Sequence, residues 1–152
     1  MANSSGVCHS FKSEILKGIH ALGTSVVRAG TGADTIKAAL YLASATRTAG
    51  DTAYSSTGEC TVTGGYSAGG ITVTNATAPS TDTSTGLWTP SASLVFSNIS
   101  PASAVDAVLI YNSTQSNKAI EVCTFTAQTP VAADLTLTMP THAAATALLR
   151  IA

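Results

Sequence analysis

The sequence predicts an all-β fold, a β-sandwich or jelly roll with one short N-terminal helix. Short runs rich in β-branched residues recur along the chain, many of them alternating between apolar and polar residues, as strands do. Clusters of Gly, Pro, Ser, Thr and Asn separate these runs, which is typical of the turns in sandwiches. Only one segment, close to the start, has apolar residues at helical spacing.

The chain has 152 residues, which suits one domain with a substantial core. We expect residues 1–9 to form an arm, residues 10–22 a helix and residues 35–152 the sandwich. In the helix, Ser10 can cap the start and Gly23 can end it in a left-handed conformation. The apolar positions of this helix are Phe11, Ile15, Leu16, Ile19 and Leu22.

The expected strands follow the β-branched runs. They are 35–46, 59–63, 70–77, 91–99, 104–112, 118–126, 134–139 and 145–152. The run at 104–112 is nearly continuous in apolar residues, which predicts a strand buried on both faces. The Ser/Thr-rich segment 75–86 is expected to form a surface loop rather than a domain linker, because strands continue on both sides of it.

Charge and hydropathy restrict the kinds of partner. The formal net charge is −1, so the chain has no basic field to attract nucleic acid. Charged residues make up only 10% of the sequence, and the mean hydropathy is +0.30. No apolar run is long enough to span a membrane, since the longest candidate is interrupted by Asp106. The polar residues of the surface are expected to be mainly Ser and Thr rather than charged residues. This composition predicts that much of the surface contacts another protein.

The start of the chain lacks a basic segment followed by an apolar block, which predicts a protein made and kept in a cytoplasm. The three cysteines, Cys8, Cys60 and Cys123, are widely spaced and form no CxxC motif. In a reducing compartment they are expected to be buried free thiols. A disulfide between two of them, or between chains, is the alternative.

The segment "GGYSAGG" (64–70) raises the question of a phosphate-binding loop. Such a loop needs a strand, then glycines, then a helix whose N-terminal amides face the anion. Here "ITVTNAT" follows, which predicts a strand. Gly64, Gly65, Gly69 and Gly70 are therefore expected to form structural turns or bulges. Tyr66 between them is expected to lay its ring on the sheet, with its hydroxyl in water.

Other residue types that carry chemistry do not form a recognisable set. His9 and His20 flank the helix too far apart to share a metal ion, and His142 lies in a late loop. Glu59 and Glu121 could converge as a carboxylate pair, but each is expected to point to solvent. No G-x-S-x-G motif is present. We predict no catalytic residue, no metal site and no cofactor.

The order of the sequence features carries a resemblance. It runs from "HSFKSEILKGIH" through "DTIKAALYLASAT", "TAYSSTGECTVTGGYSAGG" and "VDAVLIYNSTQSNKAIEVCTF" to a terminal "ALLRI". This succession resembles a family of small structural proteins of tailed bacteriophages and prophages, over nearly the whole chain. Its most specific parts are the glycines around Tyr66 and the "LIYN" strand. Cys60 and Cys123 depart from that pattern, which has aliphatic residues there.

The resemblance implies a virion component without catalytic activity. The expected role is a capsid cement, or decoration, protein that binds the outer shell and bridges capsomers. Its expected partners are the major capsid protein and further copies of itself, as a dimer or trimer. Neither nucleic acid nor a membrane is expected as a partner. A neck, tail or fibre-adaptor component is the alternative within this class, and a host-glycan-binding module is the alternative from another class.

Candidate contact residues lie at two places. Arms adapt readily to neighbours, so Ser4, Ser5 and Val7 of the N-terminal arm are expected to contact the capsid. Trp88 stands at the junction of a loop and a strand, where a single Trp is either a lid on the core or an interface anchor.

Overall fold

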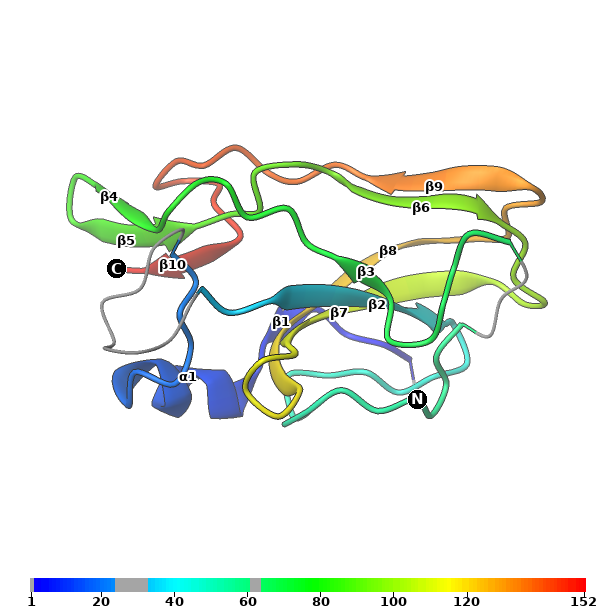
Figure 1. Cartoon of the computed structure of the whole chain (residues 1–152), viewed down its shortest axis with the longest axis horizontal. Coiled ribbons are helices and arrows are strands. Elements are labelled where there is room, and N and C mark those ends of the chain that lie inside the picture. Colours follow the sequence, from blue (N-terminus) through cyan, green and yellow to red (C-terminus); the bar gives the residue numbers. More distant parts are fainter. Residues whose placement is uncertain (1, 24–32, 61–63) are drawn as a thin grey trace.

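An antiparallel sheet of five strands forms one layer of the molecule, with strand order β1-β8-β7-β2-β3 (Figure 1). The computed structural model describes residues 2–23, 33–60 and 64–152. The elements of these residues are β1 (Gly6–Val7), α1 (His9–Leu16), β2 (Ile36–Leu42), β3 (Ile71–Thr72), β4 (Ser80–Asp82), β5 (Thr85–Trp88), β6 (Leu94–Ile99), β7 (Val105–Asn112), β8 (Lys118–Gln128), β9 (Ala133–Leu137) and β10 (Leu149–Ile151). The all-β prediction with one short helix is confirmed.

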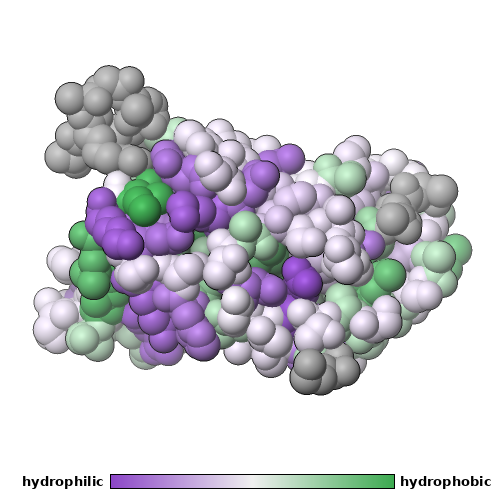
Figure 2. All heavy atoms as spheres, turned by 90° about the horizontal axis from the view of Figure 1, so that it is seen from below, coloured by the Kyte–Doolittle hydropathy of each residue, from purple (hydrophilic) through white to green (hydrophobic). Residues whose placement is uncertain are grey.

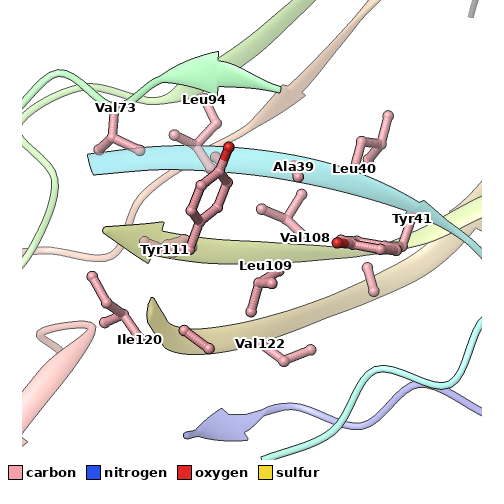
Figure 3. Packing of buried hydrophobic residues seen from close by; sticks show 14 of the residues in the cluster. Ala39, Leu40, Tyr41, Val73, Leu94, Val108, Leu109, Tyr111, Ile120 and Val122 are labelled. Atoms are coloured by element: carbon pink, nitrogen blue, oxygen red, sulfur yellow. The ribbon is translucent and has the colours of Figure 1, made fainter. Parts of the chain in front are cut away.

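Strand β7 lies at the centre of the large sheet, between β2 and β8. Its side chains are buried on both faces except for half-buried Asp106, as its apolar sequence predicts. In the ladder with β2, Ala39 faces Leu109 and Leu40 faces Val108. Figure 3 shows these side chains beside Ile120 and Val122 of β8. The ladders that join β7 to β2 and β8 therefore form the centre of the hydrophobic core.

The remaining strands form two groups, one at the end of the molecule that holds α1 and the other over the large sheet (Figure 1). One is the three-stranded sheet β10-β5-β4, and the other is the pair β6-β9. Leu94 and Phe96 of β6 are buried, and the Phe96 ring lies 5.9 Å from that of Tyr66. The arrangement is therefore sandwich-like, with a second layer that is not one continuous sheet.

The helix is shorter than predicted. It ends at Leu16, and Gly18 with a φ of +68° reverses the chain. The Ile19 amide donates to the Glu14 carbonyl and the Gly18 amide to the Ile15 carbonyl, which together form a Schellman motif. The prediction of a helix over 10–22 that Gly23 ends is wrong, because Gly18 already supplies the left-handed residue that ends it.

The start of the helix also differs from the prediction. The residue before the first helical turn is Cys8, and no side chain caps the helix there. Ser10 lies inside the helix, where its backbone carbonyl accepts a hydrogen bond from the Ser13 hydroxyl. Ser10 is therefore not the cap.

The segment 75–86 is not simply a loop. Its second half contains β4 and the start of β5, which pair as a hairpin with Asp82 opposite Thr85. Thr83 takes a φ of +58° at the turn. The prediction failed because the strand residues are Ser, Thr, Asp and Gly, and β4 is fully exposed, so no apolar alternation marks it.

The N-terminal arm packs against its own domain. Gly6 and Val7 form β1 and pair with Val122 and Glu121 of β8. Asn3 donates to the Leu42 carbonyl, and its side-chain oxygen accepts from the amide of Arg47. The expectation of a separate arm over 1–9 is corrected, because these bonds make it the edge of the large sheet.

The other expected strands have counterparts in β2, β3 and β6 to β10, while residues 61–63 of the expected strand 59–63 lie outside the described residues. The strand expected at 70–77 is reduced to two residues in β3. Within this framework, the segment between β2 and β3 is brought onto the large sheet. That segment contains the glycines singled out above.

All three cysteines are free thiols, and burial raises the pKa of each. The pKa is raised to about 12 for Cys8 and Cys123 and to about 11 for Cys60. We expect alkylation by iodoacetamide at pH 8 to be slow in the native protein, because on the order of a thousandth or less of each thiol is ionised. Mass spectrometry should show all three labelled rapidly in denaturant, and rapid native labelling would contradict this account.

Candidate functional site

The glycine segment 64–70 surrounds a buried carboxylate. Glu59 is only 4% exposed, and it accepts three hydrogen bonds. Its Oε1 accepts from the Tyr66 hydroxyl at 2.6 Å and from the Gly69 amide at 2.7 Å. Its Oε2 accepts from the Tyr54 hydroxyl at 2.6 Å. The prediction that Glu59 points to solvent is wrong, because this segment folds back over the sheet and brings donors to it.

Tyr66 connects this carboxylate to the large sheet. Its ring is buried, and its hydroxyl accepts a hydrogen bond from the Leu40 amide of β2 at 2.9 Å while donating to Glu59. Burial and the hydrogen bond to Glu59 raise the pKa of the Tyr66 hydroxyl. The expectation that this hydroxyl lies in water is therefore wrong.

The other tyrosines gather at the same place. Tyr111 donates to the Gly69 carbonyl at 2.7 Å, and its ring stacks on that of Tyr54 with centroids 4.8 Å apart. Tyr41 donates to the Ser55 carbonyl at 2.6 Å. These are all four tyrosines of the chain. We call Glu59, Tyr54, Tyr66, Tyr111 and Gly69 the Glu59 cluster.

Close backbone contacts explain the glycines on either side of Tyr66. A Cβ added to Gly64 or Gly65 would lie 2.1 Å from the carbonyl oxygen of Asn98 or Ser97, respectively. One added to Gly70 would lie 1.9 Å from the Ala38 carbonyl oxygen. The segment therefore lies directly against β6 on one side and β2 on the other, as only residues without side chains allow.

The Glu59 cluster is built to hold this segment in place. The Gly69 amide, which a phosphate-binding loop would offer to an anion, is already bonded to Glu59. Burial raises the pKa of Tyr54, Tyr66 and Tyr111, which keeps these hydroxyls protonated as donors. The Glu59 cluster is therefore structural, because the hydrogen bonds to one carboxylate hold residues 54, 66 and 69 together.

A second buried polar cluster fixes the chain after α1. His20 donates from Nε2 to the Glu14 carboxylate at 2.9 Å, and the Asn112 amide donates to His20 Nδ1 at 3.1 Å. Glu14 also accepts from Lys118. Burial opposes ionisation of Glu14, but the hydrogen bonds from Lys118 and His20 outweigh it and lower the pKa of the carboxyl. The cluster ties α1 to the ends of β7 and β8.

Trp88 is a core residue. It is 2% exposed, and its Nε1 donates to the Asn75 side-chain oxygen at 2.9 Å. The structure therefore supports the interpretation of Trp88 as a residue that covers the core, and not as an exposed interface anchor. Among the arm residues, Ser4 donates its amide to the Arg47 carbonyl, and the Ser5 hydroxyl accepts from the Thr124 amide. These contacts hold the arm on its own domain.

A largely apolar groove of about 1140 Å³ runs between α1 and β10, and Trp88 lines it. We call it the α1–β10 groove. Phe11 and Ile15 contribute from the helix, and Leu149 and Ile151 from β10. Two of its lining side chains are strongly exposed, Leu16 by 89% and Ile151 by 62%. Figure 2 shows hydrophobic atoms on the surface at the end where Figure 1 places α1.

Glu121 lies beside this groove, in a smaller cavity of about 450 Å³ between β1 and β10. Its Oε2 is buried without a hydrogen-bond partner, and burial raises the pKa of the carboxyl from 4.5 to about 8. The expectation that Glu121 points to solvent is thus also wrong, since this carboxylate oxygen is enclosed.

The raised pKa of Glu121 predicts a pH effect. Between pH 4.5 and about 8 the folded state binds more protons at Glu121 than the unfolded state does, so this residue makes stability fall as pH rises. We expect Glu121→Gln to be more stable than the wild type at pH 9 and closely similar to it at pH 4.5. Urea unfolding at the two pH values measures this. An equal difference at both would contradict it.

Comparison of the chain with family models, with curated proteins and with solved structures found no match. Within residues 2–23, 33–60 and 64–152, no group of three or more His, Cys, Asp or Glu side chains could hold a metal ion. No helix in the described part of the chain has the length and apolar character needed to cross a membrane.

Proposed function

We propose that this protein is a structural component of a tailed-phage virion, and most directly a capsid cement protein. The resemblance in the order of sequence features supports this proposal. The most specific part of that resemblance is the segment 64–70, which packs around the buried Glu59 carboxylate and is held there by hydrogen bonds from Tyr66 and Gly69. A segment whose residues are used to hold the domain together suits a protein whose task is mechanical.

The observation that carries the proposal is the placement of exposed aliphatic side chains. Leu16 and Ile151 are exposed on α1 and β10. Val131 is 79% exposed in the connection between β8 and β9, which lies at the opposite end of the long axis in Figure 1. Val95 is 41% exposed on β6. The apolar groove at one end and the exposed aliphatic side chains away from it offer separate places for contact, which a bridging protein needs.

A cement protein acts by simultaneous contacts. Each contact with a shell subunit can be weak, because a second contact on the same molecule binds at high effective concentration. The combined contacts oppose the outward pressure of packaged DNA without any chemical step. On this proposal the partners are the major capsid protein and further copies of the chain, as a dimer or trimer, on the outer surface of the virion.

Copy number tests the proposal. We expect quantitative mass spectrometry of purified virions from a phage that encodes this chain to find it in a fixed, high ratio to the major capsid protein. Such a ratio follows from binding at every equivalent site of a symmetric shell. A few copies in each particle would overturn the cement role and favour a neck, tail or fibre adaptor, and absence from the virion would overturn the whole class.

A glycan array tests the alternative from the other class. Sugar-binding sites commonly present an exposed aromatic face, whereas the ring of Trp88 is buried here. We expect no specific glycan to bind. A reproducible hit that soluble sugar displaces would favour the binding module over the virion component.

A further inference from the structure

Strand β10 presents an open edge beside the α1–β10 groove. Among the described residues, β10 has a ladder partner on one side only, where Leu149, Arg150 and Ile151 pair with Trp88, Leu87 and Gly86. An edge strand offers backbone donors and acceptors to an added strand. All three β10 residues also line the groove. Backbone groups for pairing and an apolar surface for side chains therefore meet at one place.

The side chains at this edge leave room for a partner. Ile151 faces Gly86 across the β5–β10 ladder, so no side chain covers it from β5. Leu16, on the helix side of the groove, is almost fully exposed. Trp88, Leu87 and Phe11 line the groove as buried residues. Aliphatic side chains of an added strand would cover Ile151 and Leu16, and this burial favours binding.

The charged side chains that line the groove are basic. Lys12 and Arg150 line it, and none of its lining residues is Asp or Glu. Glu121 lies in the adjoining cavity, which Arg150 also lines, and burial raises the pKa of this carboxyl to about 8, so it is mostly uncharged at pH 7. Glu14, on the same helix as Lys12, is buried and bonded to His20 and Lys118. An incoming segment that carries carboxylates would therefore meet complementary charge, whereas a basic segment would be repelled.

We propose that the α1–β10 groove binds an extended segment of a partner protein, with alternating aliphatic and acidic residues, which adds as a strand to the free edge of β10. The aliphatic residues would contact Leu16 and Ile151, and the acidic residues, on the other face of the added strand, would pair with Arg150, which alternates with Ile151 along β10. The proposal rests on the proposed function only for the identity of the partner, which would then be the capsid shell protein. The recognition mode itself is strand addition.

A second copy of this chain fits the edge less well. If two β10 strands paired antiparallel about a two-fold axis, the middle residue Arg150 would face Arg150 of the other copy. Like charges directly opposite each other in a ladder are destabilising. A shifted register would relieve the repulsion but would shorten an overlap that is already only three residues long. The charge pattern therefore favours an acidic strand from a different protein.

Synthetic peptides provide the test. The probe is a capped heptapeptide of alternating valine and aspartate, and its controls are the same peptide with lysine for aspartate and one with alternate backbone amides methylated. Trp88 is the only tryptophan of the chain and lines the groove, so its fluorescence reports occupancy without a label. We expect the acidic peptide to bind, the lysine peptide to bind about tenfold more weakly, and the methylated peptide not to bind.

Variants assign the binding to the groove. Arg150→Glu should weaken the acidic peptide about fivefold and strengthen the lysine peptide by a similar factor. Ile151→Ser should weaken binding of the acidic peptide about tenfold, because it removes the aliphatic contact without adding a charge. The matched control is Val131→Ser, which alters a similarly exposed aliphatic side chain outside the groove and should change nothing. Circular dichroism should show that all three variants are folded, since each position is exposed.

Five outcomes would overturn the proposal. They are no binding of the acidic peptide, equal binding of the methylated peptide, equal binding of the acidic and lysine peptides, binding unaffected by Ile151→Ser, and self-association through β10 in sedimentation experiments. Virion copy number is measured separately. Peptide binding by a protein found in few copies would overturn the cement role alone, while high copy number without peptide binding would overturn only this docking site.

Discussion

Replacing Glu59 with alanine is expected to lower the free energy of unfolding by about 3–5 kcal/mol, which is a large share of the stability of a domain this size. The side chain accepts hydrogen bonds from the Tyr54 and Tyr66 hydroxyls and from the Gly69 amide. Removing it leaves these three donors without their acceptor, and an unmade hydrogen bond in the interior costs more than a made one contributes. Urea unfolding followed by Trp88 fluorescence measures the loss.

The matched control is Glu59→Gln. Glutamine retains an oxygen for Tyr66 and Gly69, and the Tyr54 hydroxyl can rotate to accept from the new amide group. We therefore expect a loss of only about 1–2 kcal/mol. If the alanine and glutamine variants were equally stable, the hydrogen bonds would not be what holds the segment 64–70, and the account of the Glu59 cluster would be wrong.

The second large effect is expected at Gly70. Gly70→Ala should prevent folding or lower the free energy of unfolding by more than about 4 kcal/mol. The new Cβ would lie 1.9 Å from the Ala38 carbonyl oxygen, in the backbone of a core strand that cannot move aside. The φ of +73° at this position adds strain for any residue with a Cβ. Soluble yield and thermal unfolding measure the outcome.

Gly69 and Gly86 separate the effect of the close contact from the effect of backbone strain. Gly69 has a φ of +86°, but a Cβ there would meet only side-chain atoms, at 3.3 Å and 3.4 Å. Gly69→Ala should therefore cost only about 1–2 kcal/mol, from strain alone. Gly86 lies in β5 with its nearest contact at 3.8 Å, so Gly86→Ala should change stability by less than about 0.5 kcal/mol. A Gly70 variant as stable as the Gly86 variant would refute the close-approach explanation.

Much of the fold could be predicted because, in most strands, the local sequence pattern agrees with the burial of the side chains. β7 is buried on both faces, and its sequence is almost continuously apolar. β6 alternates, with Leu94 and Phe96 inward and Val95 outward. β4 has no such pattern, because its exposed Ser, Thr and Asp residues are ordered by pairing with β5 rather than by burial. Periodicity in the sequence reflects the burial of alternate side chains, so a hairpin whose side chains are exposed cannot be recognised from it.

The Glu59 cluster escaped prediction for a different reason. The sequence predicts that the glycines and Tyr66 are structural, but it places the carboxylate that organises them in solvent. Its donors come from residues 54, 66 and 69, and the stacked Tyr111 comes from β7, which no local pattern relates to Glu59. A weak signal was present, since Tyr54, Glu59 and Tyr66 lie close together in a chain with few aromatic residues.

The pairing of β1 with β8 sets an order on the folding of the nascent chain. Gly6 is synthesised more than a hundred residues before its partner Val122. Until β8 has emerged, the N-terminal residues have no edge to join, and the central strands β2 and β7 can pair without them. The arm can therefore join the large sheet only after β2 and β7 are able to pair, and contacts that form this late are expected to affect the rate of unfolding more than the rate of folding.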